Sequence, residues 1–125
     1  MPDAALLDRL RDILDALECI PRRCAGLTSA EDFHRDDEGR DRLDAICMTL
    51  IAVGEALKQI DRQTESRLLA RYPQVDWTGV IGVRNVIAHG YFDIDVEQVY
   101  DICITDIPRL IETVRMMVRH VVAGS

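Results

Sequence analysis

The chain has 125 residues, of which 48% are apolar and 30% are charged, and its formal net charge is −7. This composition excludes a disordered tail, a collagen-like repeat and a low-complexity array, and the acidic balance excludes a uniformly basic nucleic-acid-binding protein. The longest nearly apolar stretch, residues 45–53, is about half of the roughly 20 residues that a membrane helix requires, and the N-terminal residues lack the pattern of a secretory signal. We therefore expect one globular domain over residues 1–125, located in the cytoplasm.

Charge is distributed unevenly along the chain. Residues 1–61 carry 8 basic and 14 acidic side chains, residues 62–92 carry 4 and 2, and residues 93–125 carry 3 and 6. Only the middle segment is positive. An acidic protein can still hold a polyanion at a local arginine cluster, while the rest of its surface lowers non-specific binding.

The four cysteines do not have the spacing of a metal site. Cys19 and Cys24 are separated by four residues, Cys47 and Cys103 stand alone, and no histidine lies at ligand spacing from any of them. We interpret them as small buried thiols of a cytoplasmic core, and we expect neither disulfides nor zinc.

Helical periodicity dominates the first half of the chain. An amphipathic helix is predicted to begin near Asp3 and to end or kink at Pro21. Thr28 and Glu31 have the spacing of a capping box for a short helix through residues 33–34, followed by a polar stretch over residues 35–41. A long helix then follows, with apolar residues from Leu43 to Ile60 at helical spacing.

The second half continues the helical pattern. We predict a short helix over residues 64–71, and a mostly buried helix over residues 77–88 that Asp76 caps and Gly90 ends. Asp95 can cap a last long helix that Pro108 should bend. Because no segment alternates apolar and polar residues as a strand does, the fold class is all-α, a four- to five-helix up-and-down bundle with a kinked C-terminal helix.

Several polar and aromatic residues stand out in this pattern. Gly54 in the long helix is placed where another backbone could approach closely. His34 and His120 have no polar companions at useful spacing, so surface or packing roles are expected for them. The three aromatics Tyr72, Trp77 and Tyr100 are interpreted as core or interface residues.

The most informative segment is GVRNVIAHGYFDID, residues 82–95, because it places three polar residues in an otherwise apolar helix. Asn85 and His89 lie on one face of that helix, whereas Arg84 and His89 are separated by about 140°. Either the helix unwinds near His89, or two copies of the chain bring Arg84 and His89 together across a two-fold axis. Taken singly, Arg84 could simply pair with an acid such as Glu55, and His89 could be a hydrogen-bonded residue of the last turn.

Taken together, these residues resemble a known family. Arg84, His89 and Tyr91 spell the R-x4-H-x-Y motif of HEPN-domain proteins, and the flanking blocks resemble the HepT-like (DUF86) toxins. Those blocks are GEA at residues 54–56, YP-x-x-x-W at 72–77, the core at 81–92, and DIP at 106–108. The resemblance covers nearly the whole chain, with Gly90 standing where an acid or amide is frequent.

The resemblance implies an all-α homodimer that acts as the toxin of a type VII toxin–antitoxin system. Its activity would be that of a metal-independent endoribonuclease without cofactors, forming 2′,3′-cyclic phosphate ends. Arg84 and His89 would be catalytic and Asn85 and Glu55 supporting. Histidine can exchange a proton near neutral pH, and arginine can bind a phosphate with two hydrogen bonds. Because one histidine cannot be acid and base in one step, the chemistry favours two copies of His89 at one cleft.

The same resemblance implies a partner and a modification. An MNT-type nucleotidyltransferase antitoxin would transfer AMP from a nucleotide to Tyr91. The added bulk and negative charge would exclude RNA from the site. Two alternatives remain open: a catalytically silent HEPN subunit that serves dimerisation or nucleotide contact beside a nucleotidyltransferase, and a purely structural bundle.

Overall fold

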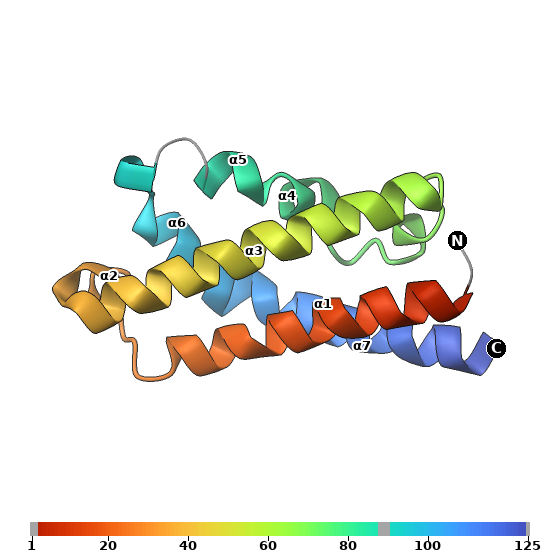
Figure 1. Cartoon of the computed structure of the whole chain (residues 1–125), viewed down its shortest axis with the longest axis horizontal. Helices are drawn as coiled ribbons and strands as arrows, with labels where there is room; N and C mark the ends of the chain where they lie inside the picture. The colour runs from red at the N-terminus through yellow and green to blue at the C-terminus, as the bar shows by residue number, and fades with distance from the viewer. Residues whose placement is uncertain (1–2, 88–90, 125) are drawn as a thin grey trace.

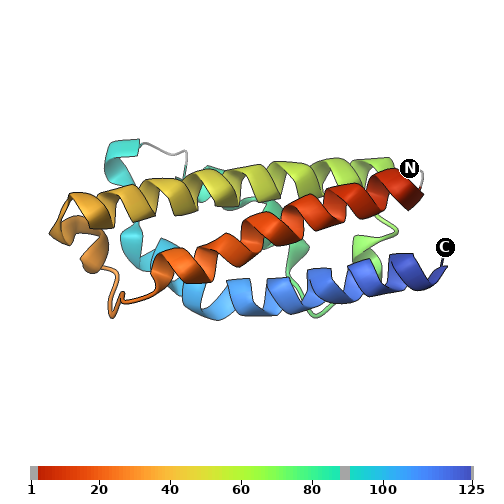
Figure 2. The same cartoon turned by 60° about the horizontal axis from the view of Figure 1, so that its bottom comes forward.

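In the computed structural model, which describes residues 3–87 and 91–124, three long helices form the body of an all-α bundle (Figure 1). They are α1 (Asp3–Cys24), α3 (Asp37–Gln63) and α7 (Ile107–Gly124). Helix α1 packs against both α3 and α7 and runs antiparallel to α3, and both ends of the chain lie at one end of the bundle (Figures 1 and 2). No strand occurs in the described residues, so the predicted fold class is confirmed.

The core consists of the apolar stripes that the periodicity predicts. Its largest fully buried side chains come from α1, α2, α3, α6 and α7 and include Leu10, Leu17, Phe33, Ile46, Leu57 and Met117. Of the two outcomes predicted at Pro21, an end or a kink of the helix, the end is wrong, because α1 continues to Cys24. Ile20 and Cys24 pack into the core on either side of the proline, and this packing offsets the hydrogen bond that proline cannot donate. Each helix within the described ranges is too short or too polar to cross a lipid bilayer.

The predicted capping box is wrong, although the short helix exists as α2 (Asp32–Arg35). Glu31 makes no capping hydrogen bond. Instead, the backbone N–H and the hydroxyl of Thr28 both donate to Oδ2 of Asp32, at 2.8 and 3.2 Å, and Arg35 pairs with the same carboxylate. Asp32 is buried, and the bonds from Thr28 hold the pKa of its carboxyl below the ordinary value. This carboxylate therefore ties the loop after α1 to α2.

Helix α3 begins earlier than predicted, within the polar stretch. Asp36 caps it by accepting a hydrogen bond of 2.7 Å from the backbone N–H of Gly39, so residues 37–41 are already helical. Gly39 is required at this position because a Cβ atom there would collide with the backbone carbonyl oxygen of Asp32. The absence of a side chain at Gly39 lets α2 lie against the first turn of α3.

This contact generates a stability prediction. Gly39→Ala should lower the free energy of unfolding by about 1–3 kcal/mol, because backbone atoms must move to accept the new methyl group. Gly54→Ala in the same helix is the matched control. Its Cβ would lie 3.4 Å from the carbonyl oxygen of Val80, an ordinary contact, and alanine is favoured over glycine in helices by roughly 1 kcal/mol. Denaturant unfolding followed by circular dichroism measures both, and equal losses would contradict the proposed close contact at Gly39.

The segment after α3 is a turn rather than the predicted helix over residues 64–71. Glu65 and Ser66 have φ angles of 54° and 62°, which a right-handed helix does not contain. The backbone N–H of Ser66 donates to the carbonyl oxygen of Asp61 at 2.8 Å, closing the end of α3. Only the 3-10 turn η1 (Leu69–Arg71) is helical here.

The predicted helix over residues 77–88 is divided by Gly82 into α4 (Trp77–Ile81) and α5 (Val83–Ile87). Asp76 caps α4 as predicted, accepting from the backbone N–H of Gly79 at 3.2 Å. The expectation that this segment is mostly buried is wrong for a single chain, since α4 has no buried residue. The two short helices form an outer layer on α3, so only one side of each is covered.

The last predicted helix is a continuous helical segment with an irregular turn. Asp95 caps α6 (Val96–Asp101) as predicted, a π-helical turn η3 (Ile102–Asp106) follows, and α7 then begins. Pro108 lacks the N–H that would bond to the carbonyl oxygen of Ile104 in a regular α-helix. A π turn thus lies immediately before Pro108, the residue at which the sequence predicts a bend.

Candidate active site

The close approach of α4 and α5 to α3 positions the residues of the predicted site. At Gly54, a Cβ atom would lie 3.4 Å from the carbonyl oxygen of Val80 and 3.6 Å from a methyl group of Val83. The expectation that Gly54 admits another backbone is therefore confirmed. Val83 and Ile87 are buried on the side of α5 that faces the bundle, so Arg84 and Asn85 are exposed on its other sides.

Arg84 pairs with Glu55, the residue that follows Gly54. Its Nη1 donates to Oε1 of Glu55 at 3.1 Å, and the two side chains are 60% and 42% exposed. An ion pair with this exposure contributes at most about 1 kcal/mol to stability, so its main effect is to orient the guanidinium group. A guanidinium has five N–H donors, and one bond to Glu55 does not exhaust its capacity to bind a phosphate.

The remaining residues of the motif are only partly described. His89 and its neighbours at 88 and 90, including Gly90 as the expected helix end, lie outside the described residues. The structure describes α5 as far as Ile87 and describes the 3-10 turn η2 from Tyr91 to Asp93. The position of the Tyr91 phenol also lies outside the described part. The structure therefore brings Arg84 and Glu55 together and leaves Asn85 exposed on the same helix as Arg84. The placement of His89 and of the Tyr91 side chain stays a prediction.

A second polar contact fixes the chain just before α4. The hydroxyl of Tyr72 lies 2.7 Å from Nδ1 of His120 on α7, and the two rings stack at 5.8 Å between centroids. The indole N–H of Trp77 donates to the carbonyl oxygen of Tyr72 at 2.9 Å. His120 thus has a polar partner, which the sequence analysis missed because Tyr72 lies 48 residues away in the chain. The three residues anchor the start of α4 to the C-terminal helix.

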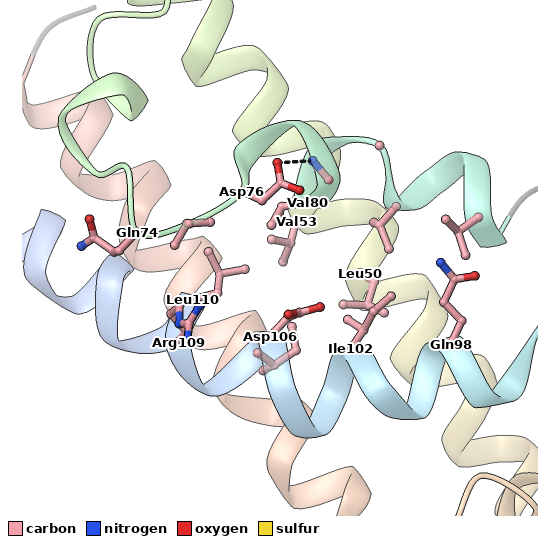
Figure 3. A pocket seen from close by; sticks show the side chains of 16 residues that line it. Leu50, Val53, Gln74, Asp76, Val80, Gln98, Ile102, Asp106, Arg109 and Leu110 are labelled. Atoms are coloured by element: carbon pink, nitrogen blue, oxygen red, sulfur yellow. Dashed lines mark hydrogen bonds between the residues drawn. The ribbon is translucent and has the colours of Figure 1, made fainter.

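A groove of about 400 Å³ lies between the outer layer, formed by α4 and α5, and the segment from α6 to α7 (Figure 3). Apolar side chains from α3, α4 and α7, including Val53, Val80 and Leu110, form its floor, and Asp76, Asp106 and Arg109 lie around it. Its lining does not include Arg84 or Glu55. Among the described site residues, Arg84, Asn85 and Glu55 therefore lie outside this groove.

The four cysteines are free thiols, with Cys47 and Cys103 buried as predicted and Cys19 and Cys24 half-buried. Burial, together with the charge of Asp44, raises the pKa of Cys47 to about 11. A hydrogen bond between Cys24 and Cys103, aided by burial, raises the pKa of Cys103, and the same bond lowers that of Cys24. Over the described ranges, no three His, Cys, Asp or Glu side chains gather in a way that could hold a metal ion.

Comparison with known proteins identifies the class that this fold and site define. The family model described as Ribonuclease HepT-like matches residues 13–117. The chain belongs to this HepT-like ribonuclease family, which supports ribonuclease activity and an RNA substrate.

Two relatives align with most of this chain and with most of their own length. The "Putative RNase MJ0127" of Methanocaldococcus jannaschii is 25% identical over 93% of this chain and 84% of its own length. The "Putative RNase TTE0752" of Caldanaerobacter subterraneus subsp. tengcongensis is 26% identical over 85% of this chain and 88% of its own length. No solved structure matches the chain significantly.

Proposed function

We propose that the protein is a cytoplasmic, metal-independent endoribonuclease, the toxin of a type VII toxin–antitoxin pair, with its active site between two copies of the chain. The observation that supports this most is the exposed guanidinium of Arg84 on α5, which is oriented by an ion pair with Glu55 on α3. Arg84 lies five residues before His89 in the R-x4-H-x-Y motif. An oriented arginine that faces solvent is suited to bind an external anion, because its free N–H groups can donate two hydrogen bonds to a phosphate.

The proposed reaction is an internal transesterification of RNA. His89 of one copy takes the proton of a ribose 2′-hydroxyl, and the 2′-oxygen attacks the adjacent phosphorus. The bond from phosphorus to the 5′-oxygen breaks, and His89 of the second copy supplies the proton that this oxygen needs. Arg84 stabilises the negative charge that develops on the phosphoryl oxygens, and Asn85 and Glu55 orient the histidine and the arginine. The products are a 2′,3′-cyclic phosphate and a 5′-hydroxyl.

This reaction predicts how cleavage responds to a chelator and to substitution of the two catalytic residues. Cleavage of RNA should persist in excess chelator and yield 2′,3′-cyclic phosphate ends, since the groups named above supply acid, base and charge. Arg84→Ala and His89→Ala should each lower the rate at least about a hundredfold, the loss typical of a positioned proton-transfer or charge-stabilising group. The measurement is gel analysis of cleaved RNA, with circular dichroism as the control for folding. A strict Mg²⁺ requirement would contradict the mechanism, and inactivity of the folded wild-type protein on total RNA would favour the silent-subunit alternative.

The outer layer of the bundle provides a surface for a second copy. Trp77 and Ile81 are only half-buried in one chain, and Phe92 is 94% exposed. Apolar side chains left partly open along one segment are typical of a surface that another protein covers. We place the two-fold axis along residues 77–92, which would bring two copies of Arg84 and His89 near each other.

Dimerisation through this surface can be tested by substituting a charged residue for one of its apolar residues. Light scattering should show a homodimer for the wild-type protein at micromolar concentration, and Phe92→Glu should shift the protein toward the monomer, because the dimer would bury the new charge. Met48→Glu is a matched control, since Met48 is 74% exposed on α3 outside residues 77–92. A wild-type monomer, or equal effects of the two substitutions, would contradict the proposed interface.

Tyr91 is proposed as the regulatory position of the same site. Its backbone begins η2, and Asp93 and Asp95 nearby are exposed acids. Transfer of AMP from ATP to the phenol oxygen, with release of pyrophosphate, would add a phosphodiester to an already acidic rim. RNA would then be excluded by bulk and by repulsion between like charges.

The modification is tested with an MNT-type nucleotidyltransferase and ATP. Intact-mass spectrometry of the wild-type protein should show one or more additions of about 329 Da, the mass of an adenylyl group on a hydroxyl. Tyr91→Phe should cleave RNA at a substantial rate but gain no mass and escape inhibition, because the hydroxyl takes no part in the reaction above. Tyr100→Phe serves as the control tyrosine. An unchanged wild-type mass, or the same gain in Tyr91→Phe, would overturn the proposal.

A further inference from the structure

A line of exposed cations extends from the Arg84–Glu55 pair along α3. One row of residues at helical spacing on α3 spans about 60° around the helix axis and consists of Ile51, Glu55, Lys58 and Arg62. Glu55 in this row is the residue that holds Arg84, so the row lies on the side of α3 next to α5. Lys58 and Arg62 therefore continue the surface on which Arg84 lies.

Both cations are available to an external ligand. Lys58 and Arg62 are exposed, and neither side chain forms an ion pair within the described part of the chain. The nearby acid Asp61 is half-buried and accepts a hydrogen bond from the hydroxyl of Ser66 at 3.3 Å. In a protein with a net charge of −7, two adjacent cations without acid partners mark a local site for negative charge.

The charge along α3 also has a direction. Its first turns are acidic on balance, with Asp37, Glu38, Asp41 and Asp44 against Arg40 and Arg42. The elements η2 and α6 lie toward that same end of the bundle with further acids (Figure 1). The C-terminal half of α3 and the turn after it lie at the other end, near both chain termini (Figures 1 and 2). A polyanion that reaches Arg84 would be repelled by the acids at the first end and would extend toward the second end.

We propose that Lys58 and Arg62 form a binding track for the RNA that flanks the scissile phosphate, running from Arg84 toward the C-terminal end of α3. The inference rests on the proposed ribonuclease function. Seven residues of helix separate Glu55 from Arg62, a rise of about 10 Å, which corresponds to about three nucleotides at roughly 3.4 Å per phosphate along a stacked strand. The two side chains bind the RNA backbone and do not touch the reacting atoms, so they govern affinity rather than the chemical step.

The experiment compares two double variants that change the net charge equally. Lys58→Gln/Arg62→Gln removes the track, and Arg40→Gln/Arg119→Gln removes two exposed cations from the first turns of α3 and from α7. Binding is measured by fluorescence anisotropy with a single-stranded 2′-O-methyl RNA, which lacks the nucleophilic hydroxyl and is not cut. Circular dichroism checks that both variants fold.

The track variant should bind about 25-fold more weakly at 0.1 M salt, since each phosphate contact to a single strand contributes a salt exponent of about 0.7 and so about fivefold. The slope of log affinity against log salt should become shallower by about 1.4. With cleavable RNA, KM should rise while kcat stays within about twofold. The control variant should change none of these quantities by more than about twofold.

The failures of the two proposals are distinguishable. If the wild-type protein binds and cuts RNA but the two double variants behave alike, the track is wrong and the ribonuclease function stands. If the wild-type protein neither binds nor cuts RNA, the function is wrong and the track falls with it. A fall in kcat with an unchanged KM in the track variant would also overturn the assignment, because it would place these cations at the reacting phosphate.

Discussion

The arrangement of the candidate site depends on the close approach of α4 and α5 to α3 at Gly54. A glycine here lets the backbone of residues 80–81 lie against the helix, and the next residue, Glu55, is then at the right distance to hold Arg84. A side chain larger than alanine at position 54 would push the outer layer away and separate the ion pair, since a Cβ atom already reaches van der Waals contact with the carbonyl oxygen of Val80. Burial of Val83 and Ile87 on the bundle side keeps α5 in place and leaves Arg84 facing outward.

The irregular parts of the helical pattern surround this layer. Gly82 divides α4 from α5, the π turn η3 precedes α7, and the turn at Glu65 and Ser66 ends α3 with positive φ angles. Each interruption changes the direction or register of the chain without removing apolar residues from the core. The contact of Tyr72 with His120 then anchors the entry to α4 on α7. The outer layer is thus fixed at its start by Tyr72 and in its middle by Gly54.

The positions of a few exposed charges matter more for ligand binding than the net charge of the protein. A net charge of −7 reduces non-specific attraction to nucleic acid, so a few exposed cations can decide where a polyanion binds. Arg84 is oriented by an acid, whereas Lys58 and Arg62 have no acid partner within the described residues. The buried carboxylate of Asp32 has a different role, because its hydrogen bonds from Thr28 hold a loop of the fold.

Patterns within the sequence predict the long helices and the family. Apolar spacing located α1, α3 and α7, and the side chains of Asp76 and Asp95 marked two caps correctly, because these signals act between residues a few positions apart. Features that depend on contacts between distant residues could not be predicted from local patterns. The partner of His120 lies 48 residues away, the requirement for Gly39 comes from the backbone of α2, and the exposure of α4 follows from its place outside α3. Local patterns predict most helical residues but not the turn at Glu65 and Ser66 or the break at Gly82. Which faces of the helices are covered depends on how the helices pack.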